Sequence, residues 1–231
     1  MTVGKTAGHE ESAKMAKDAF LPPPLAHTLF KPYPILPAAM ETERHPLPPF
    51  LPENARLLML GSFPPPKKRW SMEFYYPNWN NDMWRIVGLL FFNDRNHFAD
   101  IPNKAFRKEC IVRFLADKGI ALYDTAAEVR RLQDNASDKF LEVVSPADLP
   151  ALLHRLPQCS TIAATGQKAM GALCGQFQAS EPPTGGFTTC RFENRLLRLY
   201  RMPSSSRAYP LSIEKKAAFY HTLFQAVNLL S

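Results

Sequence analysis

Four short apolar runs, each followed by small or polar residues, constrain the fold of this chain more than any other feature. They cover residues 55–61, 120–124, 160–166 and 194–202. A near-continuous apolar run of this length is typical of a strand buried on both faces, as in parallel sheets. Elsewhere apolar residues recur at helical spacing, which predicts helices over residues 81–92, 103–119, 145–156, 167–177 and 212–230.

This alternation predicts an α/β protein, a three-layer α/β/α sandwich around a central, four-stranded, largely parallel sheet. In the helix over 145–156 we interpret Ser145 and Pro146 as the cap and the first turn. Residues 1–45 differ, because prolines such as those of "FLPPPLAHTLFKPYPILPAAM" (20–40) deny both helix and ladder hydrogen bonds. We therefore predict a Pro-rich, poorly ordered arm over 1–45 and one domain over 46–231.

The composition limits the partners and the compartment. A net charge of +7 over 231 residues favours a polyanionic partner. No apolar run approaches the ~18 residues of a membrane span, and the N-terminus lacks the apolar core of a signal peptide. We expect a cytoplasmic, nucleoid-associated protein without a membrane partner. The four cysteines form no C-x-x-C pair, so we expect no metal site and no other cofactor.

The segments after the four predicted strands locate a candidate site. They are "GSFPPP" (61–66), "DTA" (124–126), "TGQKA" (165–169) and "PSSSRAYP" (203–210). Ligands of parallel sheets bind beyond the carboxyl ends of the strands, so these loops should converge on one site. No dinucleotide, P-loop or G-x-S-x-G motif occurs, and we place all six histidines outside the loop tips, which argues against a Ser-His-Asp hydrolase. Hydroxyls and a guanidinium in "PSSSR" suit a phosphodiester backbone.

The stretch "WSMEFYYPNWNNDMW" (70–84) is dense in aromatic rings and amides, and it follows the first strand. Aromatic faces stack on flat rings, and amides and carboxylates recognise ring edges, so a nucleobase extruded from its duplex would use both. Trp84 we interpret as core, whereas for Tyr76 and Asn81 we favour a functional role. The stretch therefore predicts a base-binding loop.

Five motifs resemble the uracil-DNA glycosylase superfamily, in the branch of the hypoxanthine-DNA glycosylases and, more distantly, the mismatch-specific uracil glycosylases. The resemblance runs from about residue 46 to the C-terminus. It rests on "LGSFP" (60–64), "YYPNWNNDMW" (75–84), "GIALYDTAAEVRR" (119–131), "TGQKA" (165–169) and "MPSSSRA" (202–208). Each motif alone is weak, but their order on the four predicted strands is fairly specific.

The resemblance implies a role for each matching position. Asn81 would be the catalytic residue that holds the attacking water, helped by Asp82 or Asp124. The base would lie against Phe63, Tyr76 and Tyr123. The DNA phosphates would be pinched by Ser62, Pro64, Gly166, Ser204 and Ser205, and the gap left by the extruded base would lie near Ser206, Arg207 and Tyr209. Three lysines are further candidates for DNA contact: Lys67, Lys68 and Lys168.

Two positions depart from the family. Phe63 and Met202 stand where uracil and mismatch enzymes carry polar catalytic residues, so hydrolysis would rest on orientation by Asn81 and on a nearby carboxylate. The sequence thus predicts a monomeric, monofunctional DNA glycosylase acting on a deaminated base such as uracil or hypoxanthine in duplex or single-stranded DNA. Lys168 is the lysine to test for Schiff-base chemistry. Two alternatives stay open: a non-catalytic binder of damaged or single-stranded nucleic acid, and a nucleoside or nucleotide hydrolase.

Overall fold

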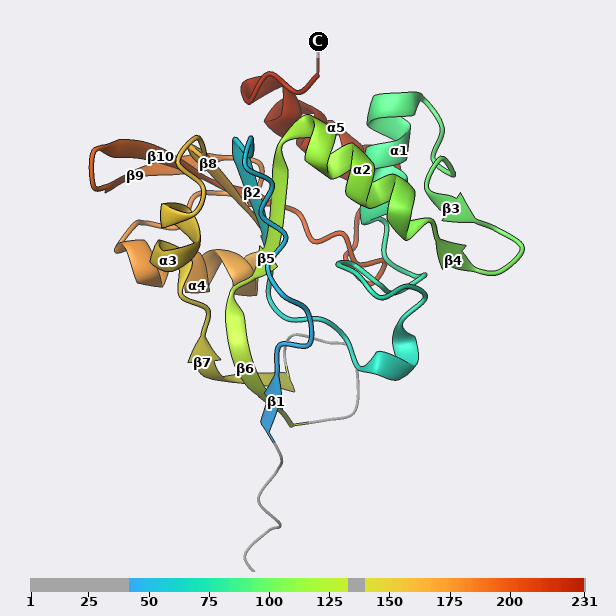
Figure 1. Ribbon diagram of the computed structural model, residues 1–231, viewed down its shortest axis with the longest axis horizontal. Helices are drawn as coiled ribbons and strands as arrows, with labels where there is room; N and C mark the ends of the chain where they lie inside the picture. The colour runs from blue at the N-terminus through green and yellow to red at the C-terminus, as the bar shows by residue number, and fades with distance from the viewer. Residues whose placement is uncertain (1–41, 133–139, 231) are drawn as a thin grey trace, which may run out of the picture. The chain divides into compact units, whose positions relative to one another are not determined.

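A mostly parallel sheet forms the centre of the molecule (Figure 1). The computed structural model describes residues 42–132 and 140–230. Five strands lie in the order β5-β2-β8-β10-β9. Their bounds are Ile120–Asp124 for β5, Leu57–Gly61 for β2, Thr161–Thr165 for β8, Arg195–Met202 for β10 and Phe187–Phe192 for β9.

The four predicted strands are confirmed, and a fifth was missed. β2 pairs in parallel with β5 and β8, and β8 pairs in parallel with β10, whereas β9 runs antiparallel to β10 at the edge. In β9 the sequence "FTTCRF" alternates between exposed and half-buried residues. An edge strand that is solvated on one face has no continuous apolar run. The predicted four-stranded sheet is therefore five-stranded.

Two helical layers cover the sheet, because successive strand residues point to opposite faces. Leu57 and Met59 belong to one hydrophobic cluster, and Leu58 and Leu60 belong to the other. The first cluster packs against α1 (Met83–Phe92), α2 (Lys108–Lys118) and α5 (Ile213–Ala226). The second packs against α3 (Leu149–His154) and α4 (Gln167–Phe177). The three-layer α/β/α sandwich is thus confirmed. Among the helices of the described residues, none is long and apolar enough to cross a membrane.

Two predicted helices begin later than expected. The one predicted from residue 103 begins at Lys108, because β4 (Ala105–Phe106) first pairs with β3 (Ala99–Asp100). The one predicted from Ser145 begins at Leu149. There the Asp148 side chain accepts the N–H of Ala151, so Asp148 is the cap, while Ser145 and Pro146 end the preceding strand. The Ser-Pro signal misled the sequence prediction, because the true Asp-x-Pro signal follows it three residues later.

Three further strands form a smaller sheet. β1 (Thr42–Arg44) pairs with β6 (Ala126–Arg131), which pairs with β7 (Leu141–Pro146). β1 thus lies before residue 46, where the domain was predicted to begin, and the domain boundary stays a prediction. The predicted disorder of the arm concerns residues 1–41, which lie outside the described residues. A short 3-10 helix, η1 (Lys67–Arg69), follows the loop after β2.

Candidate active site

A pocket lies beyond the carboxyl ends of β2 and β8. After β2 the chain continues to β5 on one side of the sheet, whereas after β8 it continues to β9 and β10 on the other side, and such a switch point is where open α/β sheets bind ligands. The cavity volume is about 120 Å³. We call it the switch-point pocket, and its lining comes from five chain segments: Gly61, Ser62, Phe63, Pro64, Pro65, Tyr75, Tyr76, Pro77, Asn78, Asn80, Asn81, Asp124, Thr165, Ser204, Ser205 and Ser206.

Asp124, at the end of β5, supplies the only carboxylate among the residues that line this pocket. It is opposite Gly61 in the β2–β5 register. A Cβ added at Gly61 would lie 2.3 Å from Asp124 Oδ1, so the carboxylate packs directly over the glycine. Glycine is needed here because any side chain would displace the carboxylate.

His45 holds the other oxygen of Asp124. Its Nε2 lies 2.9 Å from Oδ2, and the imidazole is almost completely buried. His45 lies outside the four loop tips, as expected for all six histidines, and it nevertheless contacts the pocket carboxylate Asp124. No local pattern could have found this residue, because it is 79 positions from Asp124 and stands beside prolines in the segment assigned to the arm.

Asn81 lines the pocket through an amide whose orientation is fixed. Its Oδ1 accepts the backbone N–H of Met83 at 2.9 Å in the first turn of α1. A backbone N–H can only donate, so this bond identifies the oxygen. Nδ2 makes no hydrogen bond within residues 42–132 and 140–230, and it leaves two N–H donors for a ligand. The Asn81 carbonyl also accepts from Arg85 Nη1 at 3.1 Å.

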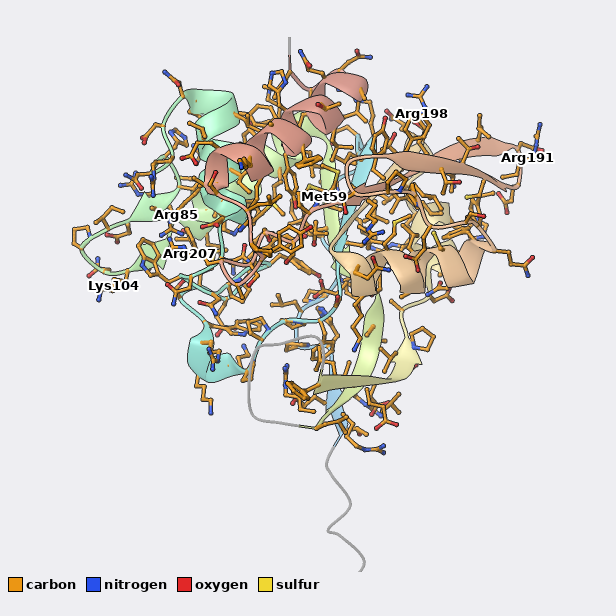
Figure 2. All side chains as sticks on the ribbon, turned by 180° about the vertical axis from the view of Figure 1, so that it is seen from behind. Met59, Arg85, Lys104, Arg191, Arg198 and Arg207 are labelled. Atoms are coloured by element: carbon orange, nitrogen blue, oxygen red, sulfur yellow. The ribbon has the colours of Figure 1, made fainter. Side chains whose placement is uncertain are left out.

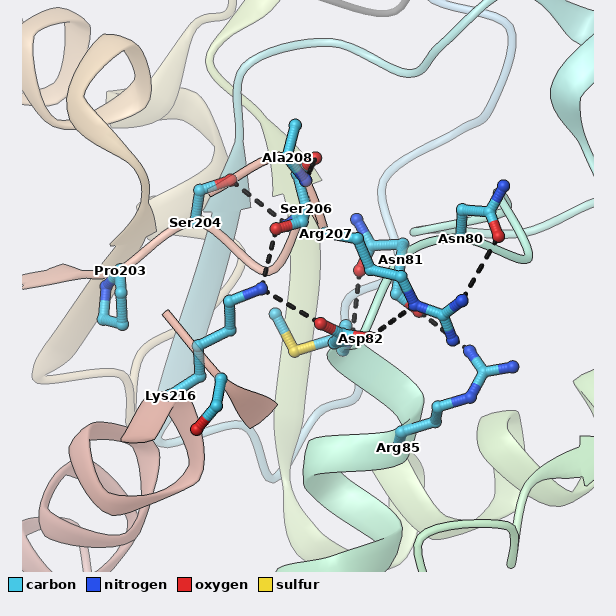
Figure 3. A network of polar contacts seen from close by, with 12 residues as sticks. Asn80, Asn81, Asp82, Arg85, Pro203, Ser204, Ser206, Arg207, Ala208 and Lys216 are labelled. Carbon is cyan, nitrogen blue, oxygen red and sulfur yellow. Dashed lines mark hydrogen bonds and ion pairs between the residues drawn. The ribbon is translucent and has the colours of Figure 1, made fainter. Parts of the chain in front are cut away.

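Asp82 lies outside the pocket lining, and both of its oxygens are bound (Figure 3). Oδ2 is 3.0 Å from Nζ of the fully buried Lys216 on α5, and Oδ1 is 3.0 Å from Nε of Arg207. Lys216 also donates to the Ser206 carbonyl at 2.7 Å. The structure thus separates two carboxylates that the sequence treated alike: Asp82 is saturated by cations, and Asp124 faces the pocket.

The same network joins the loop before α1 to the loop after β10. The Asp82 N–H donates to the Ser205 carbonyl at 2.8 Å, and Asn81 forms a backbone bridge with Ser206. Arg207 Nη1 donates to Asn80 Oδ1 at 3.3 Å. These contacts hold both rims of the pocket together.

Arg85 stabilises the loop before α1 through contacts of its guanidinium. It is buried, its guanidinium lies over the Trp79 ring, and it donates to the Trp79 carbonyl at 2.9 Å. Burial, and next the neighbouring Arg207 guanidinium, lower the pKa of Arg85 to about 10. Figure 2 shows these two arginines close together, away from Arg191 and Arg198 on the β9–β10 side. Two guanidinium groups therefore lie near the loop before α1.

Tyr76 supplies an aromatic surface to the pocket from a strained backbone. Its φ is +50°, a conformation that costs a bulky residue ~1–3 kcal/mol. The hydroxyl is 3.3 Å from Thr165 Oγ1, and the ring meets Trp84 edge-on with centroids 5.9 Å apart. Burial raises the pKa of the Tyr76 hydroxyl, so it stays protonated. Trp84 is itself core, as its helical spacing indicated.

The other predicted site residues divide into two groups. Five of the DNA-contact candidates line the pocket: Ser62, Pro64, Ser204, Ser205 and Ser206. Ser62 Oγ is buried and has no hydrogen-bond partner among the described residues. Six lie outside the lining: Lys67, Lys68, Gly166, Lys168, Arg207 and Tyr209.

Several of these outer residues have other partners. Lys67 pairs with Glu73, and Lys168 donates from Nζ to the Leu141 carbonyl. Gly166 begins α4 with a φ of +108° and donates its N–H to the Met202 carbonyl. These contacts place Lys67 and Lys168 in local structure; they do not test a role in DNA binding.

The residues that depart from the family, and Tyr123, lie in three different places. Phe63 lines the pocket and meets the His45 ring edge-on at 5.3 Å. Met202 is buried in the core and does not line the pocket. Tyr123 is not among the residues that line the pocket, and its ring centroid is 4.7 Å from that of His45. Within the described ranges, no group of three or more His, Cys, Asp or Glu side chains could hold a metal ion.

Comparison with known proteins identifies the fold. No protein-family model matches the chain, and no curated protein matches it. The solution NMR structure of a candidate uracil DNA glycosylase from Methanosarcina acetivorans is similar, with a TM-score of 0.56 and 20% identity, covering 81% of this chain and 99% of that one. At this identity the likeness shows a shared fold. The predicted uracil-DNA-glycosylase-like fold is confirmed, and the resemblance to the hypoxanthine branch stays a prediction.

Proposed function

We propose that this protein is a monofunctional DNA glycosylase, which binds a deaminated base flipped out of DNA and hydrolyses its N-glycosidic bond. The observation that carries the proposal is the composition of the switch-point pocket. An aromatic ring from Tyr76, an amide donor from Asn81 and a carboxylate from Asp124 meet in one cavity at the switch point. The shared fold with a candidate uracil DNA glycosylase supports the same reading.

The size of the pocket favours a base over a free nucleotide. Its volume of about 120 Å³ is well below the ~300–1,000 Å³ of pockets that enclose drug-sized ligands. One flat ring system suits this space, and the sugar and phosphates would remain outside, against the serine-rich rim. This argues against the nucleotide hydrolase and for a base presented by a polymer, whose flipping costs a few kcal/mol.

In the proposed reaction a water oxygen bonds to C1′ of the deoxyribose while the C1′–N bond breaks, and the base leaves as an anion with the bonding electron pair. One proton of the attacking water passes to Asp124 Oδ1 and from there to solvent, and the departed base takes up one proton from solvent. The same carboxylate stabilises the positive charge that develops on the sugar. Asp82 is assigned no chemical role, because Lys216 and Arg207 occupy both of its oxygens.

Asn81 is assigned to the leaving base. The resemblance gave it the attacking water, but its Oδ1 is engaged by Met83 and its Nδ2 donors are available. A donor is most useful where negative charge develops, which is at a carbonyl oxygen of the departing base. Of the described residues that line the pocket, none is a lysine, so water is the proposed nucleophile and strand cleavage is not part of the proposal.

A base-release panel tests the function. Purified protein is mixed with duplex and single-stranded oligonucleotides that carry uracil, hypoxanthine, a G·T mismatch or an oxidised pyrimidine, and abasic sites are cleaved with alkali. Base release on one of these substrates that falls by about 10²-fold or more in Asn81→Ala is the expected result. Tight, salt-sensitive binding of the same DNA without any release would overturn catalysis and favour the non-catalytic binder, the function that Phe63 suggests.

A further inference from the structure

His45 is fixed on every side, although it lies before the first strand of the central sheet. Its backbone N–H donates to the Ala127 carbonyl at 2.8 Å, directly after β1 pairs with β6. The ring packs among Phe63, Tyr75 and Tyr123, with centroid distances of 5.3, 6.1 and 4.7 Å. A buried imidazole with this many neighbours has one orientation, so its two nitrogens have fixed partners.

Those partners commit one oxygen of Asp124 to His45. Nδ1 lies 2.8 Å from the Leu47 carbonyl oxygen and 3.2 Å from the Leu47 amide nitrogen. A neutral imidazole protonated at Nε2 would accept the Leu47 N–H at Nδ1, and an imidazolium would donate from Nδ1 to the Leu47 carbonyl. In both of these forms Nε2 carries a proton and donates it to Asp124 Oδ2 at 2.9 Å.

The bond to His45 also fixes the direction of the second oxygen of Asp124. Oδ1 has no hydrogen-bond partner among the described residues, and it lies over Gly61 at the floor of the switch-point pocket. A carboxylate held by one oxygen cannot rotate its other oxygen away without breaking the bond to His45. The orientation of the pocket carboxylate therefore depends on His45.

We infer that His45 is a positioning residue of the reaction: its Nε2 holds Asp124 so that Oδ1 faces the reacting atoms. The inference rests on the proposed glycosylase function for its kinetic consequences, but the contact itself does not. It extends the active site to residues 45–47, which contribute no side chain to the pocket lining. The histidine works through Asp124 and touches no substrate.

Two amide variants separate positioning from a merely structural role. In His45→Gln the side-chain Nε2 takes the place of the imidazole Nε2 and can donate to Asp124, whereas in His45→Asn the Nδ2 takes the place of Nδ1 and can reach only Leu47. Positioning predicts that the single-turnover rate of base release in His45→Gln stays within about 10-fold of wild type, while His45→Asn loses about 10²-fold or more. Equal rates in the two variants, or a faster His45→Asn, would overturn the inference.

His154→Gln is the matched control. His154 also faces a carboxylate, with Nε2 3.7 Å from Glu193 Oε1, but it is exposed and away from the pocket. We expect its rate to equal that of wild type. The dissociation constant for DNA and the melting temperature of each variant are measured in parallel. A folding defect would lower the melting temperature of both amide variants.

A measurement without substrate keeps this inference distinct from the proposed function. In nitrogen-15 NMR spectra of labelled protein, a hydrogen-bonded Nε2 proton of His45 should be visible in wild type and His154→Gln and be lost in Asp124→Ala. Its absence from wild type would overturn the positioning role whatever the activity. Its presence, in a protein that releases none of the tested bases, would instead count against the glycosylase proposal.

Discussion

Asp82 and Asp124 are two equally buried carboxylates near Asn81, and each is 6% exposed. Asp82 is bound by two cations, Lys216 and Arg207, one on each oxygen. Asp124 is bound by one imidazole and keeps an oxygen at the pocket. Burial alone therefore does not identify a functional carboxylate. What separates the two is whether the surrounding protein has already used both oxygens.

The most direct way to break this comparison is Asp124→Asn. The amide keeps the size of the side chain but cannot accept a proton from water, so we expect base release to fall by about 10³- to 10⁴-fold, or about 4–5.5 kcal/mol of barrier. Single-turnover kinetics on the best substrate of the panel measures it. Asp82→Asn is the matched variant, and a larger kinetic loss there, with the fold intact, would reverse the roles given to the two residues.

Lys216→Met tests the other carboxylate, Asp82, through the stability of the protein. It leaves the buried Asp82 with a single, half-exposed cationic partner, and breaking a buried ion pair costs about 3–5 kcal/mol of unfolding free energy. Urea titration of the purified variant measures the loss.

The double variant Asp82→Leu/Lys216→Met replaces both charges with apolar groups and should recover much of that stability. If the double variant loses more unfolding free energy than the two single variants lose together, Asp82 and Lys216 do not act as the coupled pair that the structure indicates.

Gly61→Ala sharpens the comparison with one methyl group. The new Cβ would lie 2.3 Å from Asp124 Oδ1, so the carboxylate must shift, and we expect base release to fall by about 10- to 10²-fold. DNA affinity, measured by fluorescence anisotropy, should change little.

Gly175→Ala in α4 is the control for this substitution, because nothing lies within 4 Å of its added Cβ. Alanine is the better helix former by up to ~1 kcal/mol, so the control should be fully active and slightly more stable. A loss of activity in Gly61→Ala no larger than in this control would remove the case for a carboxylate held over the glycine.

Tyr76→Phe is the smallest change and tests the ring against the hydroxyl. The long 3.3 Å contact with Thr165 contributes no more than about 0.5–1.5 kcal/mol, while the aromatic face remains. We expect base release within about 10-fold of wild type. Tyr76→Ala should lose far more, since base–aromatic stacking contributes ~1–3 kcal/mol. Equal losses in the two variants would assign the function of Tyr76 to its hydroxyl.

The sequence predicted the parts of this protein that local periodicity determines. The runs "LLML", "IALY" and "TIAAT" specify strands by themselves, and the loops after them converge because parallel strands end on one side. The edge strand β9 was missed because its exposed residues interrupt the apolar pattern. Its position depends on pairing with β10, which no local pattern encodes.

The sequence predicted side chains that line the pocket, but it did not predict the long-range contacts that hold them. Tyr76, Asn81 and Asp124 stand in loops that sequence patterns mark, and all three line the pocket. The role of Asp82 depends on Lys216, 134 positions away, and the orientation of Asp124 depends on His45, 79 positions away. Contacts over such separations follow from the three-dimensional arrangement and leave no trace in spacing or composition.

The bonds between the two rims have a consequence for recognition. Because Asp82 is hydrogen-bonded to Ser205 and Asn81 forms a backbone bridge with Ser206, the loop before α1 and the loop after β10 form one preorganised surface. Under the proposed function, the distortion that brings a base into the pocket would fall on the nucleic acid. Nucleotides that pair weakly with their opposite strand resist that distortion least. Discrimination by this protein would then begin in the helix of the DNA, before any atom of the base reaches the pocket.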